Sequence, residues 1–292
     1  MNASRRRFLS TGVGLGAWMT AGLTRPGSTM GHSNEPHSLG APIISRAHQR
    51  VVIFNADDFG MSEEIDRGIL EAHDGGTVSS ASLMVDEPHT AVAVEEARRR
   101  PDLSLGIHIA FDHRGRWFVD TQDLGAVRRE VERQLDVFIR MTGRPPTHID
   151  SHHHVHRQFN VAHVFLLAGE RYGVPVRGFS DVAYMGGFYG QPEFGKTDLS
   201  RITLEALTAI LEALQPGVWE ISCHPGHLEH RSDAYYNYER EVELQVLVDP
   251  RLKAACTAPH FRRISFSDYQ RLPGRRDRGM LACRSSPIAA AH

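Results

Sequence analysis

Residues 147–156 read THIDSHHHVH, so five of these ten positions are histidine. Neutral imidazole is the commonest metal ligand in proteins, and it also titrates close to neutral pH. The run is not an affinity tag, because tags sit at chain ends and this run lies between a predicted strand and a predicted helix. A solvated polar loop is the other simple interpretation. The clusters found elsewhere in the chain argue instead for a functional site.

Three other polar clusters directly follow apolar runs in the same way. They are NADD at 55–58, GIH at 106–108 and CHPGH at 223–227. Open α/β sheets and α/β barrels build their active sites from polar groups at the carboxyl ends of several strands. The four clusters therefore predict one active site at one edge of a parallel sheet.

Apolar runs suited to buried strands alternate along the chain with helical patterns, which predicts a parallel sheet. Strands are expected at 51–54, 78–85, 103–110, 147–150, 174–177, 217–223 and 263–266. Helices are expected at 62–72, 89–100, 124–141, 159–172, 202–214 and 236–248. About seven such units in this length favour a closed or nearly closed barrel. We therefore expect an α/β fold, a distorted and TIM-barrel-like (β/α) barrel with mostly parallel strands, and a long loop at 178–200.

The two ends of the chain do not fit this barrel pattern. Residues 4–10 read SRRRFLS and resemble a twin-arginine export signal, and the apolar run that follows is too short for a stable membrane span. We expect a signal peptide at 1–30, a linker at 31–49, the catalytic barrel at 50–272 and a disordered tail at 273–292. The protein is then expected to be periplasmic or secreted.

Net charge and cysteine content limit the classes of protein to which the chain can belong. A formal net charge of −2 over 292 residues gives no indication of binding to nucleic acid. The three cysteines, Cys223, Cys256 and Cys283, form neither a disulfide framework nor a paired zinc motif, so we expect inert buried thiols. The sequence leaves the oligomeric state open, a homodimer included.

The four clusters together supply the groups that hydrolysis of an amide or an ester needs. One carboxylate of the pair Asp57 and Asp58 can join His108 and His152 as a facial set of metal ligands with open positions. The other carboxylate then stays free as a base, provided that a turn at the strand end aims both inward. His224 is placed to protonate a leaving group from the opposite side.

These blocks resemble the signature of the YdjC-like carbohydrate deacetylase family, which includes the chito-oligosaccharide deacetylases. The resemblance extends from Val51 to Tyr269 and is carried by NADDFGMS at 55–62, GIH at 106–108, the histidine-rich run at 147–156 and CHPG at 223–226. It implies a distorted barrel, one divalent metal ion (Mg²⁺ or Zn²⁺) and a small carbohydrate substrate. The implied reaction is hydrolysis of a linear amide C–N bond, in which water activated by the metal removes acetyl from an N-acetylated sugar or oligosaccharide.

The resemblance also implies roles for individual residues. By this resemblance, Asp57 would be the base and His224 the acid. The metal ligands would be Asp58, His108 and His152, and the substrate site would include His154 and Arg177. The chain departs from the family in two respects. It carries an export signal, whereas most members are cytoplasmic, and residues 109–114 (IAFDHR) are more polar than the usual apolar and threonine-rich run.

Two other classes of protein remain compatible with these residues. Two histidines and one carboxylate also describe the non-haem iron oxygenases, but a second carboxylate beside the ligand is what hydrolysis needs. Oxygen consumption with Fe(II) and a 2-oxo acid would identify that class. The other alternative is a non-catalytic exported protein that binds a sugar or a metal. Acetate release from acetylated chito-oligosaccharides would exclude it.

Overall fold

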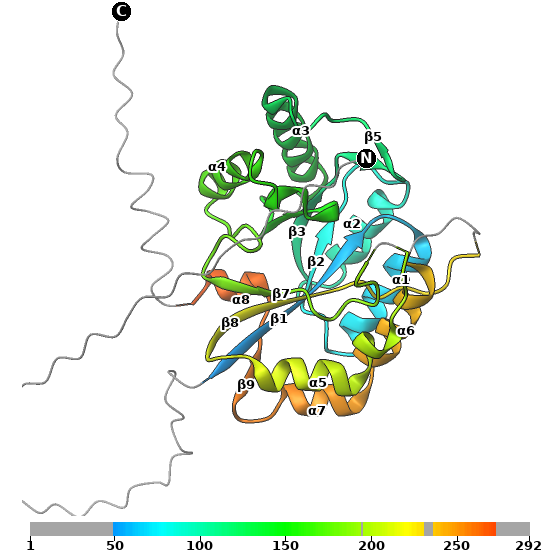
Figure 1. Ribbon diagram of the computed structural model, residues 1–292. Helices are drawn as coiled ribbons and strands as arrows, with labels where there is room; N and C mark the ends of the chain where they lie inside the picture. Colours follow the sequence, from blue (N-terminus) through cyan, green and yellow to red (C-terminus); the bar gives the residue numbers. More distant parts are fainter. Residues whose placement is uncertain (1–48, 194, 231–235, 273–292) are drawn as a thin grey trace, which may run out of the picture. The chain divides into compact units, whose positions relative to one another are not determined.

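The strand β1 (Arg50–Phe59) lies at the centre of a parallel sheet (Figure 1). The computed structural model describes residues 49–193, 195–230 and 236–272. The order of the strands is β6-β3-β2-β1-β8-β7, and every pairing is parallel. A seventh strand, β9, pairs in parallel with the first residues of β1. The remaining strands of this sheet are β2 (Ser80–Leu83), β3 (Ser104–Ile109), β6 (Ile149–Ser151), β7 (Val182–Met185), β8 (Gly217–Cys223) and β9 (Phe261–Arg263).

The sheet is curled and its outer face is covered by helices, which gives a distorted (β/α) barrel as predicted (Figure 1). Among the described residues no ladder joins β6 to β7, so the barrel stays open between them. The α-helices are α1 (Glu63–Asp74), α2 (Thr90–Arg98), α3 (Leu124–Thr142), α4 (Ala162–Tyr172), α5 (Leu204–Ala213), α6 (Asn237–Leu247), α7 (Pro250–Cys256) and α8 (Phe266–Gln270). Two 3₁₀ turns are η2 (His152–Arg157) and η3 (Leu199–Ile202).

The short helix α8 covers the amino ends of the strands inside the barrel. Its first backbone amides donate to the hydroxyls of Ser80 and Ser104, at the starts of β2 and β3. The ring of Phe266 stacks on that of His148 at 3.9 Å between centroids. The barrel is therefore closed at this end, and its active face lies at the other end.

Alternation along the strands places apolar side chains on the outer face. The inner face is polar toward the carboxyl ends of the strands, whereas Ile53 forms a small apolar cluster with Val182, Ile264, Phe266 and Tyr269. On β1, the side chains of Val52, Phe54 and Ala56 join the main core beneath the helices. The intervening Asn55 contacts the inner residues Ser82 and Asp150 instead. The buried inner positions of the other strands continue this pattern and hold Ser80, Ser82, Ser104, His108, His148, Asp150, Glu220 and Ser222. The middle of the barrel is therefore a hydrogen-bonded polar network beneath the active face.

Several predicted elements differ from those in the structure. Residues 178–200 were expected to be a loop but include β7, because Val182–Met185 pairs with β8. Residues 174–177 form no strand, and Val176 makes only an isolated bridge to Ile149. The last strand ends at Arg263, not at Phe266. The helix α7 and the hairpin of β4 (Asp112–His113) and β5 (Arg116–Trp117) were not predicted.

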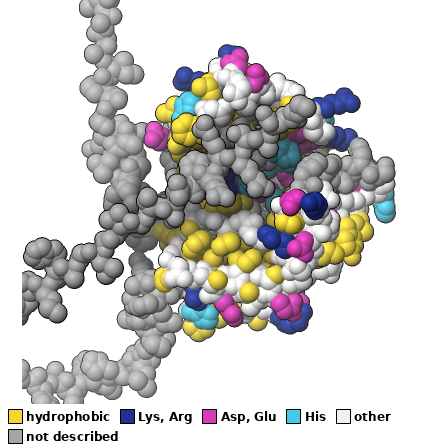
Figure 2. Space-filling model, in the orientation of Figure 1, with side chains coloured by type: hydrophobic (Ala, Val, Ile, Leu, Met, Phe, Trp, Pro, Cys, Tyr) yellow, Lys and Arg dark blue, Asp and Glu magenta, His cyan; other side chains and the backbone are white. Residues whose placement is uncertain are grey.

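The predicted signal peptide at 1–30, nearly all of the linker and the tail at 273–292 lie outside the described residues. Within the described part, no helix is long and apolar enough to cross a membrane. Figure 2 shows a band of hydrophobic side chains where α5 lies in Figure 1, and histidine and acidic side chains in a hollow near the middle of the same face.

Candidate active site

The end of β1 bends so that two consecutive carboxylates are both buried. Asp58 has a left-handed backbone (φ 67°), and the register with β2 shifts between Ala56 and Phe59. Such a bulge places an extra residue in the strand and turns its side chain away from the regular alternation. Asp57 and Asp58 are 1% and 2% exposed, so neither is a solvated turn residue. The capping hydroxyl of Ser62, which accepts from the Ile65 amide, then starts α1 as predicted.

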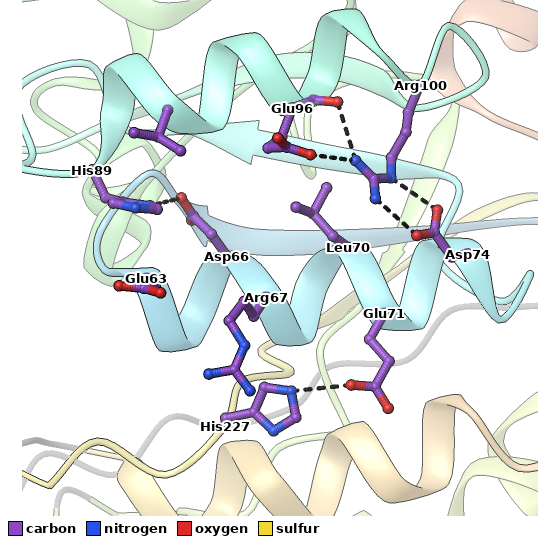
Figure 3. Close-up of a pocket in the computed structure, with 11 residues that line it drawn as sticks. Glu63, Asp66, Arg67, Leu70, Glu71, Asp74, His89, Glu96, Arg100 and His227 are labelled. Carbon is purple, nitrogen blue, oxygen red and sulfur yellow. Dashed lines mark hydrogen bonds and ion pairs between the residues drawn. The ribbon is translucent and has the colours of Figure 1, made fainter.

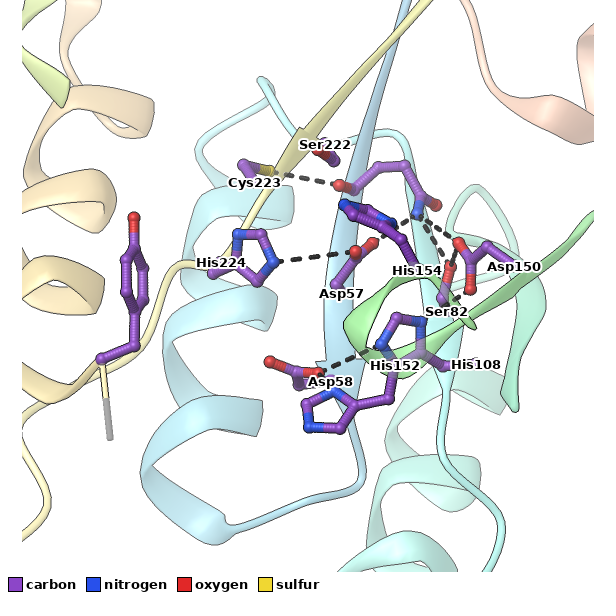
Figure 4. Close-up of polar contacts among 12 residues, drawn as sticks. Asp57, Asp58, Ser82, His108, Asp150, His152, His154, Ser222, Cys223 and His224 are labelled. Carbon is purple, nitrogen blue, oxygen red and sulfur yellow. Dashed lines mark hydrogen bonds and ion pairs between the residues drawn. The ribbon is translucent and has the colours of Figure 1, made fainter. Parts of the chain in front are cut away.

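Asp58, His108 and His152 form one cluster (Figure 4). The Oδ1 atom of Asp58 lies 3.2 Å from Nε2 of His108 and 3.1 Å from Nδ1 of His152. One possible ligand atom from each residue lies within 4.8 Å of the others. They come from the ends of β1, β3 and β6, which the parallel sheet brings to the same edge. The structure thus brings together the three predicted metal ligands.

The chemistry of these donors fits a divalent cation. Asp150 Oδ1 lies 2.6 Å from Nδ1 of His108, so Nε2 points toward Asp58, as in carboxylate–histidine–metal arrangements. Burial raises the pKa of Asp58, but Arg240, 2.5 Å from its Oδ2 atom, and His152 lower it more, which keeps the carboxylate charged. Burial lowers the pKa of His108, yet Asp150 and Asp57 raise it more, to about 10. A cation between these ligands would take the place of that proton.

Asp57 lies beside this cluster but is held by different partners. Both of its oxygens accept from Arg177, at 2.7 and 2.6 Å, and Oδ1 also accepts from Asn55 at 3.0 Å. Burial raises its pKa, but the Arg177 guanidinium lowers it more, so Asp57 remains ionised at neutral pH. Its Oδ2 atom is 3.7 Å from Nε2 of His224. Asp57 is therefore a fixed carboxylate that is available as a base.

Arg177 was expected to line the substrate site, and its position corrects that expectation. Its side chain is completely buried and lies within 2.8 Å of oxygens of Asp57, Asp150 and Glu220. Burial raises the pKa of Glu220 to about 7, which reduces the excess of negative charge around the single guanidinium. Arg177 therefore supports Asp57 from below, and the open face of the site lies beyond its reach.

His224 follows β8 and faces Asp57 across the site (Figure 4). Its backbone amide donates to Glu243 Oε2 at 2.5 Å, while its buried Nδ1 atom has no hydrogen-bond partner. Burial lowers the pKa of His224 to about 4, so the ring is neutral at pH 7. Burial also raises the pKa of Glu243 to about 8. His224 is thus a neutral imidazole that can accept a proton and pass it on.

His154 belongs to none of the groups of possible metal ligands among the described residues. Its Nε2 atom is 3.1 Å from the hydroxyl of Tyr184, which also contacts Ser222 at 2.9 Å. Burial lowers the pKa of His154 to about 4, and its Nδ1 atom has no partner. Tyr184 comes from β7, inside the segment that was predicted to be a loop. The sequence marks Tyr184 as one of several aromatic residues in that segment, but its contact with His154 depends on the pairing of β7 with β8.

Cys223 is buried, as predicted, and its thiol faces the backbone of β1, 3.4 Å from the carbonyl of Asn55. Cys256 is buried as well, whereas Cys283 lies outside the described residues. Burial raises the pKa of both thiols. Neither thiol is therefore a nucleophile at neutral pH.

A separate groove of about 570 Å³ is lined by residues of α1 and α2 (Figure 3). Several of its charged side chains are paired with one another: Arg100 with Asp74 and Glu96, and His89 with Asp66. It contains none of the residues in the metal cluster. We assign it no part in the chemistry.

A deep cluster of acidic residues and histidines at the carboxyl ends of parallel strands defines a hydrolase-type active site on a (β/α) barrel. Residues 51–258 match the family described as YdjC-like protein. The chain therefore belongs to the YdjC-like family.

Named relatives and one solved structure extend over most of the chain. A carbohydrate deacetylase from Geobacillus stearothermophilus is 32% identical and covers 76% of this chain and 99% of its own length. A chitooligosaccharide deacetylase from Serratia marcescens is also 32% identical and covers 75% and 99%. A putative cellobiose-phosphate cleavage protein from Enterococcus faecalis superimposes with a TM-score of 0.66 at 25% identity and covers 76% and 99%.

Proposed function

We propose that this protein is a metal-dependent hydrolase that removes acetyl from an N-acetylated sugar or oligosaccharide. The observation that carries the proposal is that two adjacent carboxylates have different contacts. Asp58 points into a cluster with two imidazoles, whereas Asp57 is held apart by Arg177 and faces His224. The names of the two deacetylase relatives support the same chemistry.

The residues of the chain provide the proton transfers. Asp57, ionised and fixed by Arg177 and Asn55, accepts a proton from the attacking water. The water oxygen forms a bond to the acetyl carbonyl carbon. A divalent cation held by Asp58, His108 and His152 would polarise that carbonyl and lower the pKa of water.

His224 completes the reaction on the side of the leaving group. Because the ring starts neutral, it must gain a proton before it can donate one. Asp57, 3.7 Å away, is placed to pass on the proton that it took from water. His224 then protonates the nitrogen as the C–N bond breaks, and a free amine and acetate leave. His154 and Tyr184, which contact each other, can hydrogen-bond to sugar hydroxyls.

The site is less suited to cleavage of a glycosidic bond, the reaction suggested by the name of the Enterococcus protein. That chemistry needs one carboxylic acid that is protonated at working pH beside a second carboxylate. Asp57 and Asp58 both have lowered pKa values. Glu220 and Glu243, whose pKa values are raised, are fully buried behind the site. No protonated carboxyl group among the described residues therefore faces the open site.

The donor set also bears on the identity of the metal. Mg²⁺ prefers oxygen ligands and retains water, whereas Zn²⁺ accepts imidazole readily. Two imidazoles and one carboxylate therefore favour Zn²⁺, with Mg²⁺ as the weaker alternative.

We further propose that the protein acts outside the cytoplasm, on the basis of the arginine-rich motif at residues 4–10.

A panel of sugars tests the proposed function. Protein that has been stripped of metal and reloaded with Zn²⁺ is incubated with N-acetylglucosamine, N-acetylated chito-oligosaccharides and phosphorylated cellobiose. We expect acetate release from at least one N-acetylated sugar, and none after chelation. Release of glucose units from the cellobiose compound without any acetate would instead identify a glycosidase.

A further inference from the structure

A second group of possible metal ligands lies next to the first, and one of its members, Asp112, belongs to the stretch 109–114 that departs from the family pattern. Asp112, at the start of the β4–β5 hairpin, lies 3.5 Å from Nε2 of His153. Together with His152, these residues place three ligand atoms within 4.8 Å of one another. Neither Asp112 nor His153 has a role in the proposed deacetylation.

The carboxylate of Asp112 has one oxygen available for a ligand. Its Oδ2 atom accepts from the backbone amide of Gly115 at 2.8 Å, which anchors the side chain to the hairpin turn. Its Oδ1 atom is buried and makes no hydrogen bond, and it is the oxygen that faces Nε2 of His153 at 3.5 Å. A buried carboxylate oxygen without a partner is costly, so this atom points to a cation or to a donor from a ligand.

The surroundings favour a metal ion. His153 is 46% exposed in its side chain, which leaves an entry path and open positions for water. One carboxylate and two imidazoles suit Zn²⁺ or a similar divalent transition metal.

We propose that Asp112, His153 and His152 form a second binding site for Zn²⁺, and that its occupancy inhibits the enzyme. The inhibition follows from the shared residue. His152 is also a member of the set with Asp58 and His108, and its Nδ1 atom lies 3.1 Å from Asp58. When the second site draws His152 away, the first set is left with two ligands. Excess zinc then weakens the site that activates water.

The number of zinc ions bound per chain tests whether the second site exists, and this measurement does not depend on enzyme activity. The full chain, stripped of metal, is titrated with zinc chloride in a calorimeter, together with Asp112→Asn and His153→Gln. His113→Gln is the matched control, because His113 is the next residue of the hairpin, is exposed and pairs with Glu87 instead. We expect wild type and His113→Gln to bind one more Zn²⁺ per chain than the other two variants. Equal stoichiometry in all four proteins overturns the site.

Acetate release tests the inhibition, and this part rests on the proposed function. With one equivalent of Zn²⁺, wild type and Asp112→Asn should turn over at similar rates. Excess Zn²⁺ should slow the wild type by tenfold or more and leave Asp112→Asn within twofold of its starting rate. Equal inhibition of both proteins overturns the sharing of His152. A protein that releases no acetate at any zinc concentration contradicts the proposed function instead, while the ion count still decides the second site.

Discussion

At the scale of single residues, the side chains of the histidine-rich run point in different directions and do not all join one ligand cluster. His153 and His154 have left-handed backbones, with φ of 53° and 52°, which breaks the regular turn at this point. Consecutive rings therefore reach different partners: His152 meets Asp58, His153 meets Asp112 and His154 meets Tyr184. The density of histidines predicted a site, and the structure places His152 beside Asp58 and His108. The sequence alone does not reveal a left-handed pair of non-glycine residues.

Arg177 provides the sharpest prediction at this scale. Arg177→Lys keeps a positive charge but loses the two-point contact that fixes Asp57. We expect kcat to fall by roughly 10²-fold, because small displacements of a catalytic group have effects of this size. KM and metal content should change little, since the side chain is buried away from the open face. A higher KM with unchanged kcat would restore the original assignment to the substrate site.

At the scale of elements, the helical patterns predicted most helices because their stripes and caps are local features. The strands were harder to delimit. Residues 182–185 lie in a stretch rich in glycine and aromatics, and only pairing with β8 makes them a strand. The helix α8 has a local capping box of Ser265 and Asp268, but its position is fixed by contacts to Ser80 and Ser104, far away in the sequence. Such elements depend on partners that a local pattern does not contain.

Gly106 connects one sequence motif to the packing of the barrel. A Cβ atom at this position would lie 2.3–2.5 Å from ring atoms of His148, which is too close for any contact. We expect Gly106→Ala to lower the free energy of unfolding by about 1–3 kcal/mol, as overpacking usually does. Chemical denaturation measures the change. Gly187→Ala is the control, because its new Cβ would meet only ordinary contacts at 3.5 Å and beyond. Equal stability of Gly106→Ala and wild type would contradict this packing.

His148 should also make stability depend on pH. Burial lowers its pKa to about 3, whereas an unfolded chain has a histidine pKa of about 6.5. Between these values the unfolded state binds more protons, so the contribution of His148 is complete above pH 6.5 and is lost as the pH falls toward 3. At pH 5 the loss amounts to at most about 2 kcal/mol.

The variant His148→Gln isolates this contribution. The wild type should lose more stability than the variant when denaturation is repeated at pH 7 and at pH 5. A loss of the same size in both proteins would show that His148 takes up no extra proton on unfolding.

At the scale of the whole molecule, the sequence predicted the barrel and the edge at which the site lies, because parallel strands share one carboxyl end. It did not predict the polar interior. Asn55, Ser82 and Glu220 occupy inner strand positions and connect Asp57, Asp150 and Arg177 beneath the active face. Ser82 and Glu220 alternate with apolar residues in their strands, and Asn55 directly follows the apolar run at 51–54. Which of them touch one another depends on the register of the strands.

The amino-terminal motif gives a prediction for the complete protein. Arg5 and Arg6 lie outside the described residues, and export rests on the sequence motif alone. We expect that changing both residues to lysine leaves the protein in the cytoplasm. Fractionation of cells followed by detection of the protein measures this, with Arg25→Lys as the control outside the motif. Periplasmic protein in the double variant would contradict export by the twin-arginine route.

The account depends most on the different roles of the two adjacent carboxylates. The decisive measurement is acetate release per bound metal ion in wild type, Asp57→Asn and Asp58→Asn, with metal content determined by elemental analysis of the same samples. We expect Asp58→Asn to lose metal and activity together. Asp57→Asn should keep its metal while turnover falls by ~10²-fold or more, the usual scale for a general base. Equal loss of metal in both variants, or full activity in Asp57→Asn, would contradict the account.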